Sequence, residues 1–199
     1  DLADDDCDGF GDEPPVGFER EGHTMQGAGS AVEWYGDYVY LAAASVLQVF
    51  HAPSDGTPVR LDHEIEFRDW VREMAVSDGT LFVAARGDGL HAFDLAADPA
   101  HPRSAGHVTG VFEAGGHARI EAVFNGVHAA AGRVAVARAN SAPKAAGGAD
   151  AVVFDYDRTG ERFVPVRVVG TEARAKTVSE IPISVALTED GRGLYIGYG

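Results

Sequence analysis

The chain has 199 residues, 45% of them hydrophobic, and carries 31 acidic against 16 basic residues for a net charge of −15. This length and apolar content suit a globular domain with a large core, or part of one. The negative charge repels nucleic acids and anionic membranes, and no apolar run approaches the length of a bilayer-spanning segment, so neither nucleic-acid binding nor membrane insertion is expected.

The sequence begins at Asp1 without an initiating methionine. We interpret it as a processed product or a fragment from which a signal peptide could have been removed. The one cysteine, Cys7, has no second thiol with which to form a disulfide in this sequence. Cys7 is therefore a free thiol, a partner for a cysteine outside this sequence, or an ordinary loop residue.

Aspartates occupy alternate positions near the start of the chain, as they do in calcium-binding loops. With Asp4 as the first position of such a loop, Gly9 falls where glycine permits a sharp turn. A helix-loop-helix site is not expected, because Pro15 replaces the glutamate that would close the loop. The expected calcium ligands are Asp4, Asp6, Asp8, the main-chain carbonyl of Phe10, and Asp12.

The pattern of residues 4–12, D-x-D-x-D-G-x-G-D, resembles the thrombospondin type-three repeats, which bind calcium between neighbouring copies. The resemblance implies calcium as a cofactor, although only one copy is present. A solvated acidic tail has the same composition and is the alternative. Residues 13–29 are rich in Gly, Pro and charge, which predicts a linker, with residues 16–19 as an edge strand.

Alternating apolar residues predict strands from there on. The first lie at residues 31–42, on either side of a Gly36-Asp37 turn, and at residues 46–50. At residues 71–95, three alternating runs are separated by Asp78-Gly79 and Gly87-Asp88-Gly89 turns, which predicts a three-stranded antiparallel meander. Prolines at 99 and 102 then mark a turn or an edge, because proline donates no backbone hydrogen bond.

The same strand-turn-strand unit recurs at a spacing of about 42 residues, which is typical of four-stranded propeller blades. A third copy at residues 127–155 carries an insertion, residues 140–148, that is expected to be a mobile loop. A short helix is the alternative for residues 118–124, because Ala and Glu favour helices. We therefore expect an all-β fold of about three and a half propeller blades. The expected blades are residues 31–67, 71–112, 121–172 and, incomplete, 181–199.

The second copy resembles the LVIVD repeat of bacterial and archaeal β-propellers, a V-A-V-S-G/D-x-x-x-Y/F-V-A hairpin followed by G-L-x-x-x-D and D-P-x-x-P. The matching elements are residues 74–84, 89–94 and 98–102, and residues 182–196 resemble the related YVTN type. The resemblance implies a secreted or cell-surface ring of roughly six to eight blades. The remaining blades would come from sequence beyond this chain or from another chain. Such motifs specify a blade and not a reaction.

Propellers usually bind ligands over the central channel, on the loops that enter the innermost strands and on those that join the second and third strands. Arginine beside an exposed aromatic side chain is a common composition of binding surfaces. A structural role is the alternative for two residues, since Trp70 could pack between blades and Arg86 could pair with a nearby aspartate. The residues predicted to contact a ligand are Arg68, Asp69, Trp70, Arg86, Asp88, His117, Arg119, Arg138 and Asn140.

The histidines show no H-x-H, H-E-x-x-H or Cys/His spacing. His128, on an expected innermost strand, is the best single metal candidate, whereas His91 is expected on a polar strand face. The sequence contains no nucleophile elbow and no phosphate loop. We therefore favour a binding or structural module that engages a protein or cell-surface component. The alternative is an enzyme with a metal or organic cofactor at the central channel.

Calcium chelation tests the interpretation of residues 4–12. Removing Ca²⁺ with EGTA is expected to lower the thermal midpoint or to change the conformation of the N-terminal segment, because clustered carboxylates that lose their cation repel one another. Calorimetry and circular dichroism measure the two effects. Unchanged stability together with an unchanged N-terminal conformation would contradict the calcium prediction.

Overall fold

The computed structural model describes residues 29–54, 56, 59–108, 111–114, 117–121, 123–138, 150–170 and 181–199. Several sequence predictions lie outside these residues and stay predictions. They are the calcium ligands Asp4, Asp6, Asp8, Phe10 and Asp12, the interpretation of Cys7, the edge strand at residues 16–19, and the insertion at residues 140–148.

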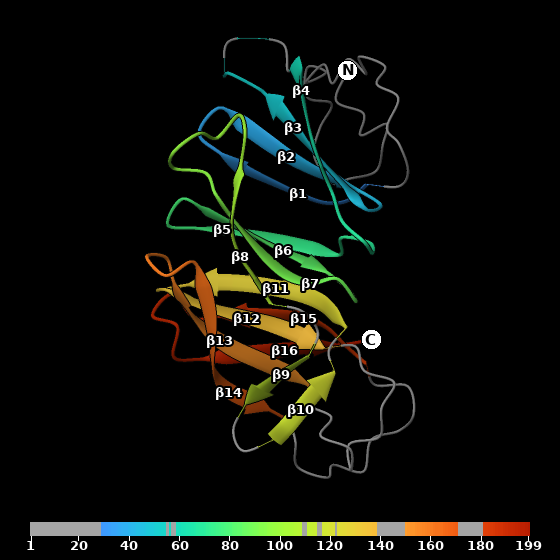
Figure 1. Cartoon of the computed structure of the whole chain (residues 1–199), viewed down its shortest axis with the longest axis vertical. Helices are drawn as coiled ribbons and strands as arrows, with labels where there is room; N and C mark the ends of the chain where they lie inside the picture. Colours follow the sequence, from blue (N-terminus) through green and yellow to red (C-terminus); the bar gives the residue numbers. More distant parts are fainter. Residues whose placement is uncertain are drawn as a thin grey trace, which may run out of the picture.

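The described part of the chain is all-β, and none of it forms a helix that is long and apolar enough to cross a membrane. Three antiparallel sheets have four strands each, in sequence order, and two further hairpins have two strands each. The sheets are arranged as β-propeller blades, stacked along the long axis of the molecule (Figure 1), which confirms the predicted fold class.

The blades are numbered in chain order. Blade 1 comprises β1 (Gly29–Tyr35), β2 (Tyr38–Ala43), β3 (Val46–His51) and β4 (Val59–Glu66). Blade 2 comprises β5 (Glu73–Ser77), β6 (Thr80–Ala85), β7 (Gly89–Asp94) and β8 (Arg103–Val108). Blade 3 comprises β11 (Phe124–Ala130), β12 (Arg133–Arg138), β13 (Ala151–Asp157) and β14 (Arg162–Val169). The described strands of blade 4 are β15 (Pro182–Leu187) and β16 (Leu194–Tyr198).

A separate hairpin connects blades 2 and 3. It consists of β9 (Val111–Ala114) and β10 (His117–Glu121), and β9 lies beside β14. This hairpin was not among the predicted strands, although Gly115-Gly116 is a hairpin signal. The helix considered for residues 118–124 is wrong, because β10 occupies most of that range as a strand.

The predicted meander of blade 2 is confirmed by β5, β6 and β7. Ser77 pairs with Thr80 across the first turn. Asp78 and Gly79 have φ angles of 49° and 69°. Two positive φ values are what a type I′ turn requires, and Asp and Gly tolerate them better than other residues do.

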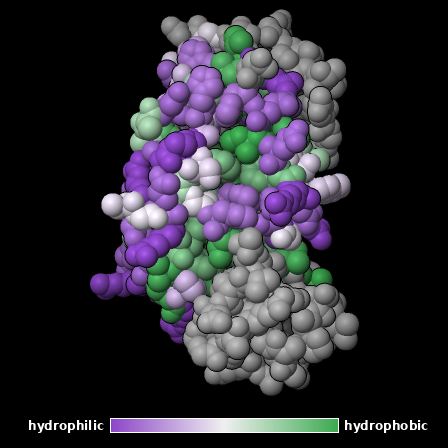
Figure 2. Space-filling view, viewed as in Figure 1, coloured by the Kyte–Doolittle hydropathy of each residue, from purple (hydrophilic) through white to green (hydrophobic). Residues whose placement is uncertain are grey.

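The core lies between the faces of neighbouring blades. Tyr40 and Leu47 of blade 1 share a buried cluster with Leu81 of blade 2, while Phe82 on the opposite face of β6 shares another with Val136 of blade 3. Every residue of β6 is buried, since alternate side chains leave opposite faces of the sheet and both faces are covered. On the face seen in Figure 2, hydrophilic and hydrophobic residues of the described chain are mixed.

Apolar side chains stay exposed on the two blades at the ends of the stack. Trp34 on β1 is 74% exposed and Tyr195 on β16 is 69% exposed. Val32, which is also on β1, and Ile183, which is on β15, are exposed as well. In a closed ring, further blades would cover these faces.

The proline-containing segment after blade 2's third strand is structural. Asp98 Oδ1 accepts hydrogen bonds from the amides of Ala100 (3.0 Å) and His101 (3.3 Å), which closes a tight turn. The Tyr40 hydroxyl of blade 1 donates to the Pro99 carbonyl at 2.7 Å. The turn therefore holds the connection between β7 and β8 and also ties blade 2 to blade 1.

The innermost strands of blades 2, 3 and 4 meet at Gly126 on β11. A Cβ atom at this position would lie 2.8 Å from Glu73 Oε2 and 2.8 Å from the Ile183 carbonyl oxygen, so a side chain does not fit. Glu73 Oε2 accepts a hydrogen bond from the Val127 amide at 2.9 Å, which ties β5 to β11. Burial raises the pKa of the Glu73 carboxyl, with a smaller contribution from Glu33 and against the lowering effect of the Val127 hydrogen bond.

Replacing Glu73 by glutamine is expected to raise the thermal midpoint at neutral pH, because glutamine keeps an acceptor for the Val127 amide and removes a partly buried charge. A carboxyl whose pKa is higher in the folded state stabilises the fold below its unfolded pKa of 4.5, and this contribution is lost as the pH rises through the folded pKa. The difference between the variant and the wild type should therefore shrink in acid. Calorimetry across the acid to neutral range measures it.

The exposed Glu66→Gln variant in β4 is the matched control. A lower midpoint for Glu73→Gln at neutral pH, or a difference that does not depend on pH, would contradict this account of the β5–β11 contact.

Candidate functional site

Reciprocal hydrogen bonds join two loops at one end of blade 2. The Arg68 amide, between β4 and β5, donates to Asp88 Oδ2 at 3.0 Å, and the Gly87 amide, between β6 and β7, donates to Asp69 Oδ2 at 3.0 Å. Each loop thus supplies a carboxylate that binds the backbone of the other. We call the joined residues the blade 2 loop surface: Arg68, Asp69, Trp70, Arg86 and Asp88, all of which the sequence predicted to contact a ligand.

Trp70 supplies the large apolar side chain of the blade 2 loop surface. It is 55% exposed, so the interpretation that it packs between blades is wrong. Arg86 Nε lies 3.8 Å from Asp69 Oδ1, which confirms the expected ion pair. Arg86 also takes a φ of 42°, in the left-handed region, and its carbonyl accepts the Phe124 amide at 3.1 Å. The turn is thereby anchored to blade 3.

The structure does not place the other predicted ligand-contacting residues on the blade 2 loop surface. His117 and Arg119 are on β10, where the structure describes the backbone only, and Asn140 lies outside the described residues. Arg138, the last residue of β12, is only 1% exposed and lies in the interior. Burial lowers the pKa of its guanidinium to about 10, opposed by the nearby charge of Asp150.

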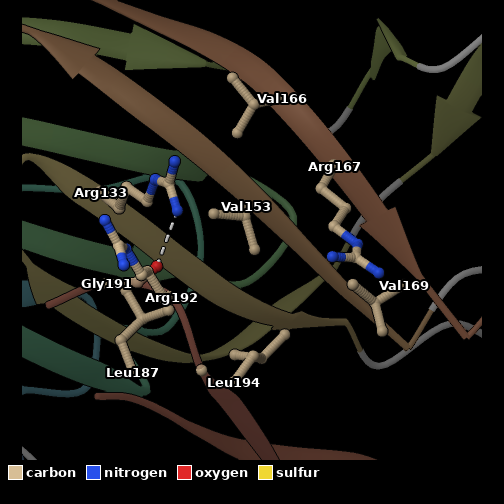
Figure 3. A pocket seen from close by; sticks show the side chains of 10 residues that line it. Arg133, Val153, Val166, Arg167, Val169, Leu187, Gly191, Arg192 and Leu194 are labelled. Carbon is tan, nitrogen blue, oxygen red and sulfur yellow. Dashed lines mark hydrogen bonds between the residues drawn. The ribbon is translucent and has the colours of Figure 1, made fainter.

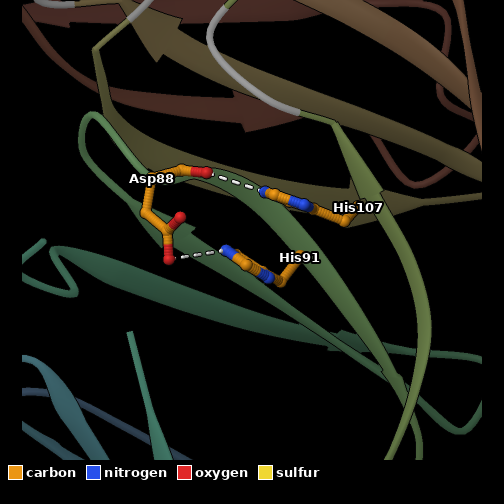
Figure 4. A group of neighbouring side chains, drawn as sticks. All are labelled: Asp88, His91 and His107. Carbon is orange, nitrogen blue, oxygen red and sulfur yellow. Dashed lines mark hydrogen bonds and ion pairs between the residues drawn. The ribbon is translucent and has the colours of Figure 1, made fainter. Parts of the chain in front are cut away.

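A histidine cluster lies next to the blade 2 loop surface. His91 on β7 and His107 on β8 are directly opposed in the sheet, and their rings stack with centroids 4.0 Å apart and planes 15° from parallel. His91 Nε2 lies 3.3 Å from Asp88 Oδ2, and His107 Nε2 lies 2.7 Å from the Asp88 carbonyl oxygen. Both rings therefore direct a nitrogen towards Asp88 (Figure 4).

The sequence predicted that His91 lies on a polar strand face. The structure does place it beside His107 and Asp88, but it largely buries the ring. Its side chain is 14% exposed, and its ring meets the edge of Phe67 at a centroid distance of 5.0 Å. Burial, with a contribution from His107, lowers its pKa to about 4, so the ring is neutral at physiological pH. Strand alternation alone could not reveal this burial, because Phe67 lies on the connection from blade 1.

His128, the best metal candidate from the sequence, does lie on an innermost strand, β11. Its Nδ1 accepts a hydrogen bond from the Leu187 amide of β15 at 3.2 Å. This contact links blades 3 and 4 and gives His128 a structural role.

A cleft of about 380 Å³ lies between the outer strands of blade 3 and the hairpin of blade 4 (Figure 3). Val153 and Val166 line it from blade 3, and Arg133 Nη1 donates to the Gly191 carbonyl at 2.9 Å at its edge. The described part of blade 4 has two strands where the other blades have four. The residues that line the cleft come from both blades, so the cleft lies at the contact between neighbouring blades.

No model of a known protein family matches the chain, and no curated protein matches it in sequence. Solved structures do resemble its fold. The COPII outer coat vertex on membranes matches with a TM-score of 0.59 and 8% identity, over 87% of this chain and 44% of that chain. The extracellular domain of the putative one-component system BT4673 from B. thetaiotaomicron matches at 0.54 and 14%, over 89% of this chain and 21% of that chain.

The computationally designed Ika4 protein matches with a TM-score of 0.51 and 12% identity, over 89% of this chain and 94% of that chain. The present chain therefore spans nearly all of Ika4 but less than half of the other two proteins. At these identities the likeness shows the β-propeller fold alone.

Asp69→Ala is expected to loosen the blade 2 loop surface, because Asp69 accepts the Gly87 and Trp70 amides and pairs with Arg86. The chain has two tryptophans, so a Trp34→Phe background leaves Trp70 as the only indole. In that background, time-resolved fluorescence should show lower residual anisotropy of Trp70 in Asp69→Ala than with Asp69 present. Asp37→Ala, in the exposed turn of blade 1, is the control and should leave Trp70 unchanged. Equal anisotropy with and without Asp69 would show that other contacts hold the loop.

Proposed function

We propose that this chain is a binding module of an extracellular or cell-surface protein and that the blade 2 loop surface recognises a protein partner. The observation that carries the proposal is the exposure of Trp70, at 55%, on a loop held by hydrogen bonds at both Arg68 and Asp69. Tryptophan and arginine dominate the energetics of many protein interfaces, because they cover a large area when a partner desolvates them.

The rigidity of the loops strengthens this argument. A loop already held in one geometry loses little conformational entropy on binding, so more of the contact energy becomes affinity. The connection that carries Trp70 is also fixed at its base, since the Val71 amide donates to the Ala44 carbonyl of blade 1 at 2.9 Å. The segment around Trp70 is therefore held by hydrogen bonds to both blade 1 and blade 2.

The structural neighbours support this class of function. One is the extracellular domain of a putative one-component system, and another is the vertex of a coat assembled on membranes. The same fold is thus found in an extracellular domain and in a protein assembly. Which partner such a protein binds is determined by its loops. The aspartates of residues 4–12 complete the proposal: a bound calcium ion there would order the segment that leads into blade 1.

The enzyme alternative requires a metal or organic cofactor at the central channel. On the innermost strands, the described histidine His128 is engaged by the Leu187 amide. The histidines of blade 2 that approach a carboxylate lie on β7 and β8, the outer strands. We therefore prefer the binding module.

A photo-crosslinking amino acid at position 70 tests the proposal on intact cells of the source organism. Position 159 is the control, because Thr159 is exposed in the turn between β13 and β14. The neighbouring Arg158 binds the Asp78 carbonyl in the β5–β6 turn, so position 159 lies at the opposite end of the blades. Position 70 is expected to capture one defined protein that position 159 does not.

The affinity of the purified, captured protein then gives the decisive comparison. Trp70→Ala should weaken binding by roughly tenfold to a hundredfold, the range for loss of an aromatic anchor. Thr159→Ala should leave binding unchanged. Equal crosslinking from both positions, or equal affinity of Trp70→Ala and wild type, would overturn the proposal.

A further inference from the structure

Asp88, His91 and His107 form a compact group of potential metal ligands at the outer part of blade 2 (Figure 4). One ligand atom from each residue lies within 4.8 Å of those of the other two. Within the part of the chain that the structure describes, no other three His, Cys, Asp or Glu side chains meet in this way. We propose that these three side chains bind a divalent transition-metal ion, with zinc as the best fit to their chemistry.

The fold itself brings the ligands together. His91 on β7 and His107 on β8 are partners in the antiparallel register, so their side chains leave the same face of the sheet side by side. Asp88 precedes His91 by three residues and lies in the β6–β7 turn, at the end of the same strand pair. Two imidazoles and one carboxylate are a ligand set that zinc accepts, with room for a further ligand from solvent.

His91 is the ligand most in need of a partner. Its Nε2 is buried and makes no hydrogen bond among the described residues, although it lies 3.3 Å from Asp88 Oδ2. Leaving a buried polar atom without a well-formed hydrogen bond destabilises a fold. A metal ion bound between the two groups would satisfy both atoms. The 3.3 Å distance is also close to that between two ligands of a tetrahedral zinc ion, about 3.3 Å for bonds of about 2.0–2.1 Å.

The surroundings hold two of the ligands in place. The Arg68 amide donates to Asp88 Oδ2 at 3.0 Å, and the Phe67 ring packs edge-on against His91. Such contacts outside the ligands fix their orientation and raise metal affinity. The side chains of Asp88 and His91 are only 9% and 14% exposed, so neither can easily turn away.

His107 supplies the movable ligand and the entry route. It is exposed to solvent, and its Nε2 lies 2.7 Å from the Asp88 carbonyl. Binding requires His107 to exchange this hydrogen bond for the metal and to tilt out of its stack with His91. The net charge of −15 favours the approach of a cation.

The bound ion would fasten the two outer strands of blade 2 to the β6–β7 turn. Asp88 belongs to the blade 2 loop surface as well, so the ion would also hold the carboxylate that anchors the Arg68 amide. This inference concerns metal binding and does not depend on the proposed partner recognition.

Titration of zinc chloride into the metal-free full chain, with calcium in excess to occupy the aspartate segment, tests the site. Calorimetry is expected to show one saturable zinc ion per chain, bound more weakly in His107→Gln. This variant removes the exposed ligand, so the fold should survive, and the affinity should fall by roughly tenfold or more. His51→Gln, a histidine of β3 outside the group, is the matched control and should bind as the wild type does.

Nuclear magnetic resonance of the imidazole nitrogens provides a second readout that does not depend on a variant. Zinc should shift the Nε2 resonances of His91 and His107 and leave that of His51 unchanged. The proposal is overturned by an absence of zinc binding, by equal affinity of His107→Gln and wild type, by equal weakening in His51→Gln, or by imidazole shifts that omit His91 or His107.

Discussion

Cover on both faces of the sheet is the constraint on which this structure depends. Blade 2 carries apolar side chains on both faces, with Leu81 and Val83 towards blade 1 and Phe82 towards blade 3. Neither set can be buried within one four-stranded sheet, so the blade is stable only between neighbours. A fully buried side chain of this size contributes about 1.5–3 kcal/mol, which makes face-to-face packing the main source of stability here. At the two ends of the described stack no blade covers the outer face, and Trp34 and Tyr195 are exposed there.

The sequence predicted those features of the fold that depend on neighbouring residues. The Asp78-Gly79 turn and the alternation on either side of it follow from local backbone preferences, and they recur in the chain, so the all-β propeller could be predicted. The β9–β10 hairpin was not predicted, although the sequence offers a turn signal of the same kind, Gly115-Gly116, between the two strands. Contacts between blades do not follow from local sequence: the Tyr40 hydroxyl reaches Pro99 across 59 positions of sequence.

The candidate site was predictable in part. Loop position in a propeller was enough to group Arg68, Asp69 and Arg86, and the structure brings these residues together. The exposure of Trp70 could not be predicted, because it depends on how the connection between blades 1 and 2 is tied at both ends. The histidine pair needed the register of β7 with β8, in which His91 faces His107. That register is set by the Asp98 turn and by an irregularity next to Ala92, neither of which follows from periodicity.

Asp88 connects the loop surface with the histidine cluster. Its carboxylate accepts the Arg68 amide and faces His91, and its carbonyl faces His107. A rigid blade thus holds a recognition loop and a set of metal ligands through one residue. Both features depend on the same packing of blade 2 between its neighbours, since Phe67 and the Val71 amide come from the connection that blade 1 supports.

Native-state hydrogen exchange of the intact chain measures this dependence most directly. Strands β2 and β6 are each the second strand of a four-stranded blade, and each is hydrogen-bonded to the first and third strands of its own blade. Of the two, β6 alone has a described blade packed on both faces. The amides of β6 should therefore exchange more slowly than those of β2. Equal exchange in the two strands would contradict the claim that each blade depends on cover from both sides.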